Sequence, residues 1–128
     1  MKKWRWIRIE VAYAIHERQL AEHGGTPGVL DAGRLEAALA RPRHLAAYNQ
    51  PDAAAPAAAY AFGILRNHPF TDGNKRTAWV LARLFLALNR YELAFEPADA
   101  VMTVEAAAAG GITESKLARW FRERCTAA

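Results

Sequence analysis

The chain has 128 residues, of which 52% are hydrophobic and 23% charged, and its net charge is +4. This length and composition are typical of one ordinary globular domain, so we expect a single domain over residues 1–128. One cysteine excludes an internal disulfide, and we find neither a signal peptide nor an apolar run long enough for a membrane span, so we expect a cytoplasmic protein. The positive charge favours anionic partners such as nucleotides, but it is too scattered to indicate nucleic-acid binding by itself.

The first half of the chain is expected to form three helices. Helical periodicity predicts the first from about Ile7 to His23, where two glycines end it. Asp31 is suited to cap a short second helix, which Pro42 ends because proline interrupts the helical hydrogen bonds. Asp52 is suited to cap a third, alanine-rich helix from about Ala53 to Arg66.

The second half is expected to form three more helices. The segment Asn74–Arg90 is apolar nearly all round, so we place this helix, buried, at the centre of the molecule. Residues Tyr91–Phe95 are expected to be a connector, and Pro97 begins a helix that ends at Gly110. Thr113 or a neighbour caps the last helix. No stretch shows sustained alternation of apolar and polar residues, so we predict an all-α bundle of about six helices.

Two groups of residues away from the centre have ordinary interpretations. Trp4 and Trp6 lie among basic residues, a pattern that superficially resembles a nucleic-acid contact. We expect instead an N-terminal arm or strand whose tryptophans pack on the bundle, and no direct nucleic-acid binding. His16, His23 and His44 lack the spacing of a metal site and are expected to be structural or surface residues.

The segment His68–Thr77, with the sequence HPFTDGNKRT, is the most informative part of the chain. It places an imidazole, a carboxylate, an amide and two cations around a glycine at the start of a predicted helix. A helix N-terminus has unpaired N–H groups and a partial positive charge, and it favours an anion. Cations in that first turn oppose the helix dipole, which is a further reason to expect an anionic ligand. This combination suits a nucleotide triphosphate.

Each polar side chain of this motif has a candidate role. His68 is the candidate general base, since an unperturbed imidazole titrates near neutrality. Asp72 is a candidate ligand of Mg²⁺, an ion that prefers one or two carboxylates together with phosphate oxygens. It is also suited to cap the helix. The candidates for phosphate binding are Gly73, Asn74, Lys75 and Arg76.

The motif resembles the signature of the Fic/Doc family, which reads His-x-Phe-x-acid-Gly/Ala-Asn-Gly/Lys-Arg. Lys75 stands where Fic enzymes carry glycine and where the Doc (death-on-curing) branch carries lysine. The upstream segment Gly24–Leu39 also resembles the Doc branch, and the likeness extends from about Val11 to Phe121. It implies a Fic-like helical fold around the Asn74–Arg90 helix.

The resemblance implies a toxin of a type II toxin–antitoxin system. Doc-type proteins use ATP to phosphorylate a threonine of elongation factor Tu and so arrest translation. By position, His68 would take the threonine proton, and Asp72 would organise Mg²⁺ or the substrate hydroxyl. Lys75 and Arg76 would act in catalysis by contacting the phosphates. Arg66 matches a basic residue of Doc and is a further ATP-binding candidate, although helix C-termini favour cations anyway.

Two departures from the Fic pattern favour phosphate transfer over AMP transfer. Lys75 fills space that a glycine leaves open, and the family resemblance implies that ATP then presents its γ-phosphate to His68. Trp79 stands where Fic enzymes carry a second arginine, so their γ-phosphate clamp is absent. We find no run that resembles the inhibitory helix of many Fic proteins, so we expect regulation by a separate Phd-like antitoxin whose tail folds into a groove.

Other functions remain open at this point. A Fic-type AMP transferase shares the site and differs at Lys75 and Trp79. A non-catalytic module that binds nucleotide, RNA or a protein partner would use the same basic groove without turnover. A ribonuclease is a weaker alternative, because we see no second acid–base partner for His68. The sequence alone fixes neither the acceptor protein nor the oligomeric state.

Overall fold

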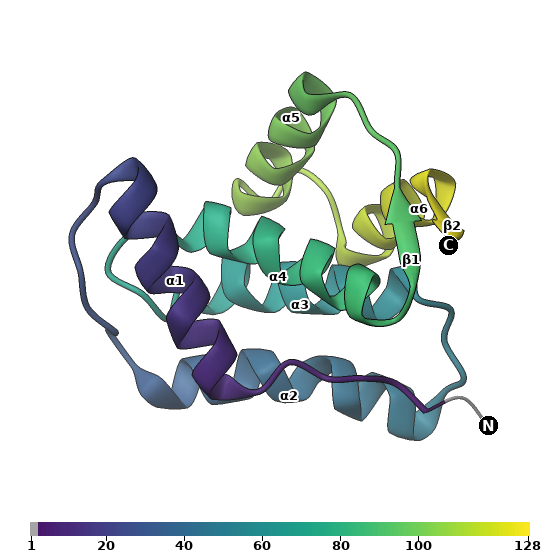
Figure 1. Ribbon diagram of the computed structural model, residues 1–128, viewed down its shortest axis with the longest axis horizontal. Coiled ribbons are helices and arrows are strands. Elements are labelled where there is room, and N and C mark those ends of the chain that lie inside the picture. The colour runs from purple at the N-terminus through teal and green to yellow at the C-terminus, as the bar shows by residue number, and fades with distance from the viewer. Residues whose placement is uncertain (1–2) are drawn as a thin grey trace.

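The computed structural model describes residues 3–128 as six helices and one two-stranded sheet (Figure 1). The all-α prediction with six helices is therefore confirmed. The elements are α1 (Ile9–His23), α2 (Ala32–Tyr48), α3 (Ala54–Asn67), α4 (Asn74–Leu88), β1 (Tyr91–Leu93), α5 (Pro97–Ala108), α6 (Glu114–Arg124) and β2 (Cys125–Ala127). Within residues 3–128, no helix is both long and apolar enough to cross a membrane.

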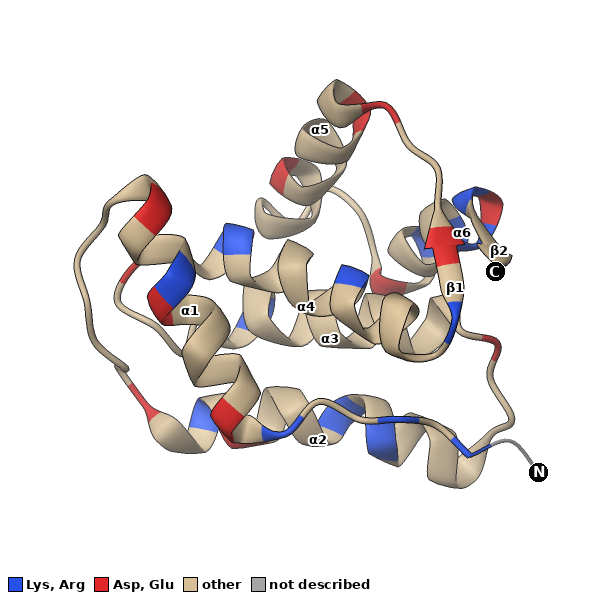
Figure 2. Cartoon of the chain, viewed as in Figure 1, with Lys and Arg blue, Asp and Glu red and all other residues tan. Residues whose placement is uncertain are grey.

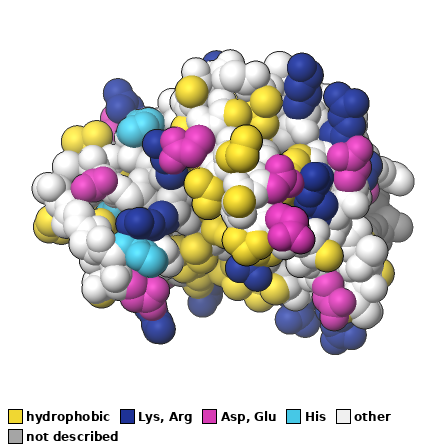
Figure 3. All heavy atoms as spheres, turned by 90° about the horizontal axis from the view of Figure 1, so that it is seen from above, with side chains coloured by type: hydrophobic (Ala, Val, Ile, Leu, Met, Phe, Trp, Pro, Cys, Tyr) yellow, Lys and Arg dark blue, Asp and Glu magenta, His cyan; other side chains and the backbone are white. Residues whose placement is uncertain are grey.

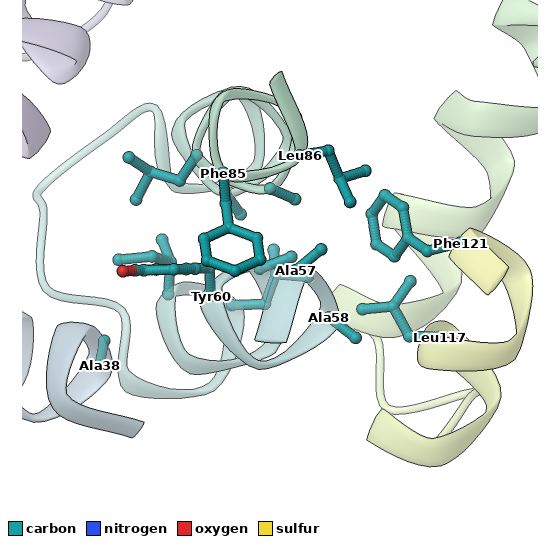
Figure 4. Packing of buried hydrophobic residues seen from close by; sticks show 14 of the residues in the cluster. Ala38, Ala57, Ala58, Tyr60, Phe85, Leu86, Leu117 and Phe121 are labelled. Atoms are coloured by element: carbon teal, nitrogen blue, oxygen red, sulfur yellow. The ribbon is translucent and has the colours of Figure 1, made fainter. Parts of the chain in front are cut away.

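The centre of the molecule is formed by α3 together with α4. The predicted helix at residues 74–90 does lie inside, but α3 is the more buried of the two, with ten of its 14 residues buried. Its alanines allow the neighbouring helices to approach closely, and Gly63 lies so near Ala38 of α2 that an added Cβ would come within 3.2 Å of that backbone. Figure 4 shows Phe85 of α4 above Tyr60 of α3, and Phe121 of α6 closing one side.

The second helix is longer than predicted. α2 continues through Pro42 to Tyr48, so the expectation that Pro42 ends it is wrong. A proline inside a helix removes one hydrogen bond and is unfavourable by about 3 kcal/mol. Here the proline is buried with Leu35 and Leu39 on the side of α2 that packs against α3. Tertiary packing therefore outweighs the local penalty.

Asp31 and Thr113 are N-caps as predicted, whereas Ala53, and not Asp52, occupies the N-cap position of α3. The side chain of Asp31 accepts a hydrogen bond from Arg34 N at 3.2 Å, and Thr113 Oγ1 accepts one from Lys116 N at 3.1 Å. Asp52 Oδ1 accepts from Ala55 N at 3.2 Å and so satisfies an amide in the first turn of α3.

The expected connector after α4 contains a strand. β1 pairs antiparallel with β2 at the C-terminal end of the chain, with Glu92 opposite Thr126. Three residues are too few to show a period of two, and the partner strand lies more than 30 residues away, so the sequence pattern did not predict this pairing.

The N-terminal arm packs on the bundle as expected. The rings of Trp4 and Trp6 each lie 5.6 Å from that of Phe85. Ile7 N donates a hydrogen bond to the hydroxyl of the buried Tyr60 at 2.9 Å. Both tryptophans are partly buried and pack against the core.

Candidate active site

The motif lies in the loop between α3 and α4, and the loop between α1 and α2 packs directly against it. Leu30 N donates to Pro69 O at 2.8 Å, and Thr71 N donates to Gly28 O at 3.0 Å. Both loops lie at the same end of the molecule, on the left of Figure 1. The upstream loop, which resembles the Doc branch, thus supports the motif loop by backbone hydrogen bonds.

His68 stands at the turn that ends α3. Its backbone adopts the left-handed conformation with φ 49°, and its N–H donates to Ile64 O at 3.0 Å. A positive φ is uncommon outside glycine, although histidine is enriched there among other residues. The exposed imidazole lines a pocket of about 340 Å³, whose walls are His68, Thr71, Asp72, Gly73, Asn74, Lys75, Arg76 and Glu105.

Asn74 holds this loop together from inside. It is only 5% exposed, and its Oδ1 accepts a hydrogen bond from Phe70 N at 3.2 Å. Its Nδ2 donates to Phe70 O at 2.9 Å and lies 3.1 Å from His68 Nδ1. The two bonds to Phe70 fix which way the amide faces, because only an oxygen can accept from Phe70 N–H.

The orientation of the Asn74 amide also determines which nitrogen of the neutral His68 ring carries the proton. Since Nδ2 can only donate, His68 Nδ1 accepts in this contact, and the neutral imidazole carries its proton on Nε2. The oxygen and both hydrogens of the Asn74 amide are thus used within the loop. Its expected donation to a phosphate stays a prediction.

Asp72 presents an ionised carboxylate at the pocket. Its Oδ2 accepts from Thr26 N at 3.1 Å and its Oδ1 from Gly73 N at 2.9 Å. These backbone hydrogen bonds, that of Thr26 first, hold the pKa of the carboxyl below its ordinary value, and Arg76 adds to the effect. The N-cap position of α4 itself belongs to Gly73, so the side chain of Asp72 braces two loops in place of capping the helix.

The donor set at Asp72 fits a magnesium ion carried with a nucleotide. Each carboxylate oxygen accepts one N–H in this arrangement and keeps a further lone pair for another partner. Among residues 3–128 no group of three or more His, Cys, Asp or Glu side chains could hold a metal unaided. A single carboxylate that shares the ion with phosphate oxygens is the usual arrangement for Mg²⁺.

Lys75 and Arg76 are both exposed in the first turn of α4. Lys75 Nζ forms an ion pair with Glu105 Oε2 of α5 at 2.8 Å. Figure 2 shows acidic positions on α5 above the basic positions of α4. Seen from above, the histidines lie at the left end beside charged side chains of both signs, hydrophobic side chains lie in the middle, and further charged side chains lie at the right end (Figure 3).

Two other predicted positions lie outside this pocket. Arg66 lines a separate cavity of about 810 Å³ between α2 and α3, with its guanidinium 5.3 Å from the ring of Phe62. Trp79 packs against Phe95 and Phe121, at ring distances of 5.1 and 6.2 Å. The structure therefore brings together every residue of the predicted site except Arg66.

Two residues near the motif were not predicted from the sequence. His16 of α1 was expected to be either a structural or a surface residue; it is buried, stacks on Phe70 and bonds to the backbone of Asp72. The signal for it was available, because Ala12 and His16 are four residues apart on the buried face of α1. Glu105 had no such signal, since it comes from a helix 30 positions further along.

The sequence matches the Fic/DOC family over residues 6–86. The chain belongs to this family. It is 38% identical over 119 residues to "Protein kinase doc" of Escherichia phage P1, across 92% of this chain and 94% of that protein. It is 45% identical over 75 residues to "Toxin Doc" of Mycolicibacterium smegmatis, across 56% of each chain.

These relatives confirm the resemblance to the Doc branch. The Fic/DOC match covers both loops and nearly all of α4, and so includes every residue of the pocket except Glu105. The ion pair between Lys75 and Glu105 thus joins the family's motif to a helix beyond the matched region.

Proposed function

We propose that this Fic/DOC protein is a Doc-type toxin kinase. It transfers the γ-phosphate of ATP to a protein hydroxyl, with a threonine of elongation factor Tu as the expected acceptor, and thereby arrests translation. The observation that carries the proposal is the shared pocket at the start of α4, where an imidazole, an ionised carboxylate and two cations converge. The printed names of the two relatives, a protein kinase and a toxin, support it.

The phosphates bind at the N-terminus of α4 in this proposal. The first N–H groups of a helix have no partner within it. In α4 the helical hydrogen bonds begin with Thr77 N, which donates to Gly73 O at 3.0 Å, so the amides before Thr77 lie ahead of these bonds. Gly73 has φ 78°, a conformation that other residues rarely adopt, and the position that a Cβ would occupy faces Leu20 and His16 of α1. Lys75 and Arg76 supply the positive charge that balances the triphosphate.

Asp72 would hold Mg²⁺, which supplies neutralisation of the phosphate charge when it is bound. The protein's own contribution is a carboxylate that is already ionised and already oriented. Both oxygens are fixed by backbone N–H groups from two different loops. Little reorganisation is then needed when the nucleotide arrives, which is the main source of catalysis in phosphoryl transfer.

His68 takes the proton of the attacking hydroxyl as the new O–P bond forms and ADP leaves. For its Nε2 to accept that proton, the ring must carry its other proton on Nδ1. The contact with Asn74 Nδ2 favours the opposite arrangement. The proposal therefore requires that this contact opens when the substrates bind, while Asn74 remains bonded to Phe70.

Control by a Phd-like antitoxin is part of the proposal. A groove of about 430 Å³ runs between α4 and α5, and its walls include Trp79, Phe95 and Val104. Lys75 and Arg76 line both this groove and the motif pocket. An antitoxin tail that folds into the groove would therefore contact the residues that bind phosphate.

The test is label transfer in a bacterial translation extract, with ATP labelled at either the α- or the γ-phosphate. We expect label from the γ-position only, on a band of the size of elongation factor Tu. The label is expected to be absent with His68→Ala. Label from the α-position would identify an AMP transferase instead, and absence of label from both positions would support a binding module.

A further inference from the structure

His16 connects α1 to the motif loop through two contacts of different kinds. Its ring stacks on that of Phe70, with centroids 3.7 Å apart and planes 8° from parallel. Its Nε2 lies 2.8 Å from the backbone oxygen of Asp72. A carbonyl oxygen only accepts hydrogen bonds, so Nε2 is the donor. The side chain is 4% exposed, so the contact is largely shielded from water.

The peptide unit between Asp72 and Gly73 is held at both of its ends. Its oxygen accepts from His16, and its N–H donates to Asp72 Oδ1 at 2.9 Å. Rotation of this unit changes ψ of Asp72 and φ of Gly73. Glycine populates positive and negative φ with similar ease, so covalent geometry alone does not select one orientation.

The two possible orientations of this peptide have opposite electrostatic effects. In the observed one, the N–H faces the carboxylate of Asp72 and helps to keep it ionised. In the reversed one, the carbonyl oxygen would face the carboxylate, and two negative groups would oppose each other. A reversed peptide would also leave His16 Nε2–H buried without its acceptor, which is unfavourable.

We propose that His16 is a positioning residue of the active site: its Nε2–H selects the orientation of the Asp72–Gly73 peptide and so aims the Asp72 carboxylate at the pocket. The effect on catalysis rests on the proposed function, whereas the effect on the loop does not. The position of His16 is itself fixed by α1, which also presents Leu20 to the loop, 3.5 Å from where a Cβ of Gly73 would lie.

The hydrogen bond and the stacking can be separated by substitution. His16→Phe keeps an aromatic ring for Phe70 and removes the donor. His16→Gln removes the ring and keeps an N–H donor of similar reach. Tyr60→Phe is a matched control, because it also removes one buried bond to the backbone, that to Ile7 N, but lies away from the pocket. His16→Leu is a second variant without a donor, in case His16→Phe does not fold.

Two readouts are measured for each variant. The first is amide hydrogen exchange at Gly73 and Thr26, followed by NMR without nucleotide or metal. The second is the dependence of phosphate transfer on Mg²⁺ concentration. Removing a group that orients a metal ligand typically lowers metal affinity or activity by about 10- to 100-fold.

We expect faster exchange at Gly73 and Thr26 in H16F or H16L, together with a rise of about 10-fold or more in the Mg²⁺ requirement. H16Q is expected to restore both, and Y60F to lower stability without changing either. Unchanged amide exchange in both donor-free variants would overturn the inference. An H16Q variant as impaired as H16F would also overturn it, since ring packing alone would then explain the effect of His16. If the wild type transfers no phosphate, the proposed function fails, and the exchange data still decide the role of His16.

Discussion

Replacement of Asn74 by alanine distinguishes a structural role of its amide within the loop from a role in binding phosphate. The substitution removes the acceptor for Phe70 N, the donor to Phe70 O and the contact with His68 Nδ1. Phe70 is completely buried, so its backbone groups lose their partners away from bulk water. Each unsatisfied buried group is unfavourable by about 1–3 kcal/mol, which gives a loss of about 3 kcal/mol in the free energy of unfolding after partial relaxation.

Thermal unfolding by circular dichroism measures this effect directly. In a domain of this size each kcal/mol shifts Tm by about 3–5 °C, so we expect Asn74→Ala to lower Tm by about 10 °C. Lys75→Ala is the control, because it removes a neighbouring exposed cation and is expected to leave Tm nearly unchanged. A normal Tm in N74A together with lost phosphate transfer would refute this reasoning, and would mean that the amide acts on the nucleotide.

Two further perturbations test charges outside the motif. Glu105→Gln frees Lys75 from its ion pair, so we expect tripolyphosphate, measured by calorimetry, to bind several-fold more tightly. The control Glu96→Gln, at the N-cap position of α5, is expected to leave tripolyphosphate binding unchanged. Weaker binding in E105Q would mean that Glu105 assists the anion. Arg122 lowers the pKa of Asp52 by hydrogen bonding. The pair therefore stabilises the fold at pH values above the ordinary pKa of an aspartate. This stabilisation is lost as the pH falls through the lowered pKa. Asp52→Asn keeps an acceptor for the first turn of α3 and is expected to lower stability at neutral pH by about 0.5 kcal/mol or less, since the pair is half exposed. In urea denaturation the difference from the wild type should vanish at low pH, and a difference that persists there would contradict the role assigned to the ion pair.

Most of the fold was predictable because its signals are local. Helical periodicity, alanine content, and the proline, glycine and capping residues at helix ends predicted five helices close to their observed bounds, and Asp31 and Thr113 cap helices as expected. α2 was predicted too short, because the penalty at Pro42 is local whereas the packing that outweighs it comes from α3. The dominance of α3 in the core was missed for a similar reason. Alanine favours any helix, and only the close approach at Gly63 shows why small residues are needed there.

In the site, too, the residues within the motif were predictable and the residues from distant helices were not. The motif predicted most of the residues that line the pocket, because residues 68–76 form one short loop and the first turn of α4 and so lie close together. It did not predict that the amide of Asn74 is used within the loop, since a side chain's partners depend on the folded path of the backbone. His16 and Glu105 come from helices before and after the motif, and only the tertiary structure brings them to it.

The central claim is that His68 directs the transfer of a phosphate group from ATP to a protein hydroxyl. Intact mass spectrometry of purified elongation factor Tu tests it most directly, after incubation with this protein, ATP and Mg²⁺. We expect a mass increase of one phosphate group with the wild type, which peptide fragmentation would locate on a threonine, and no increase with H68A. An increase of one AMP group would contradict it, as would phosphorylation that persists in H68A.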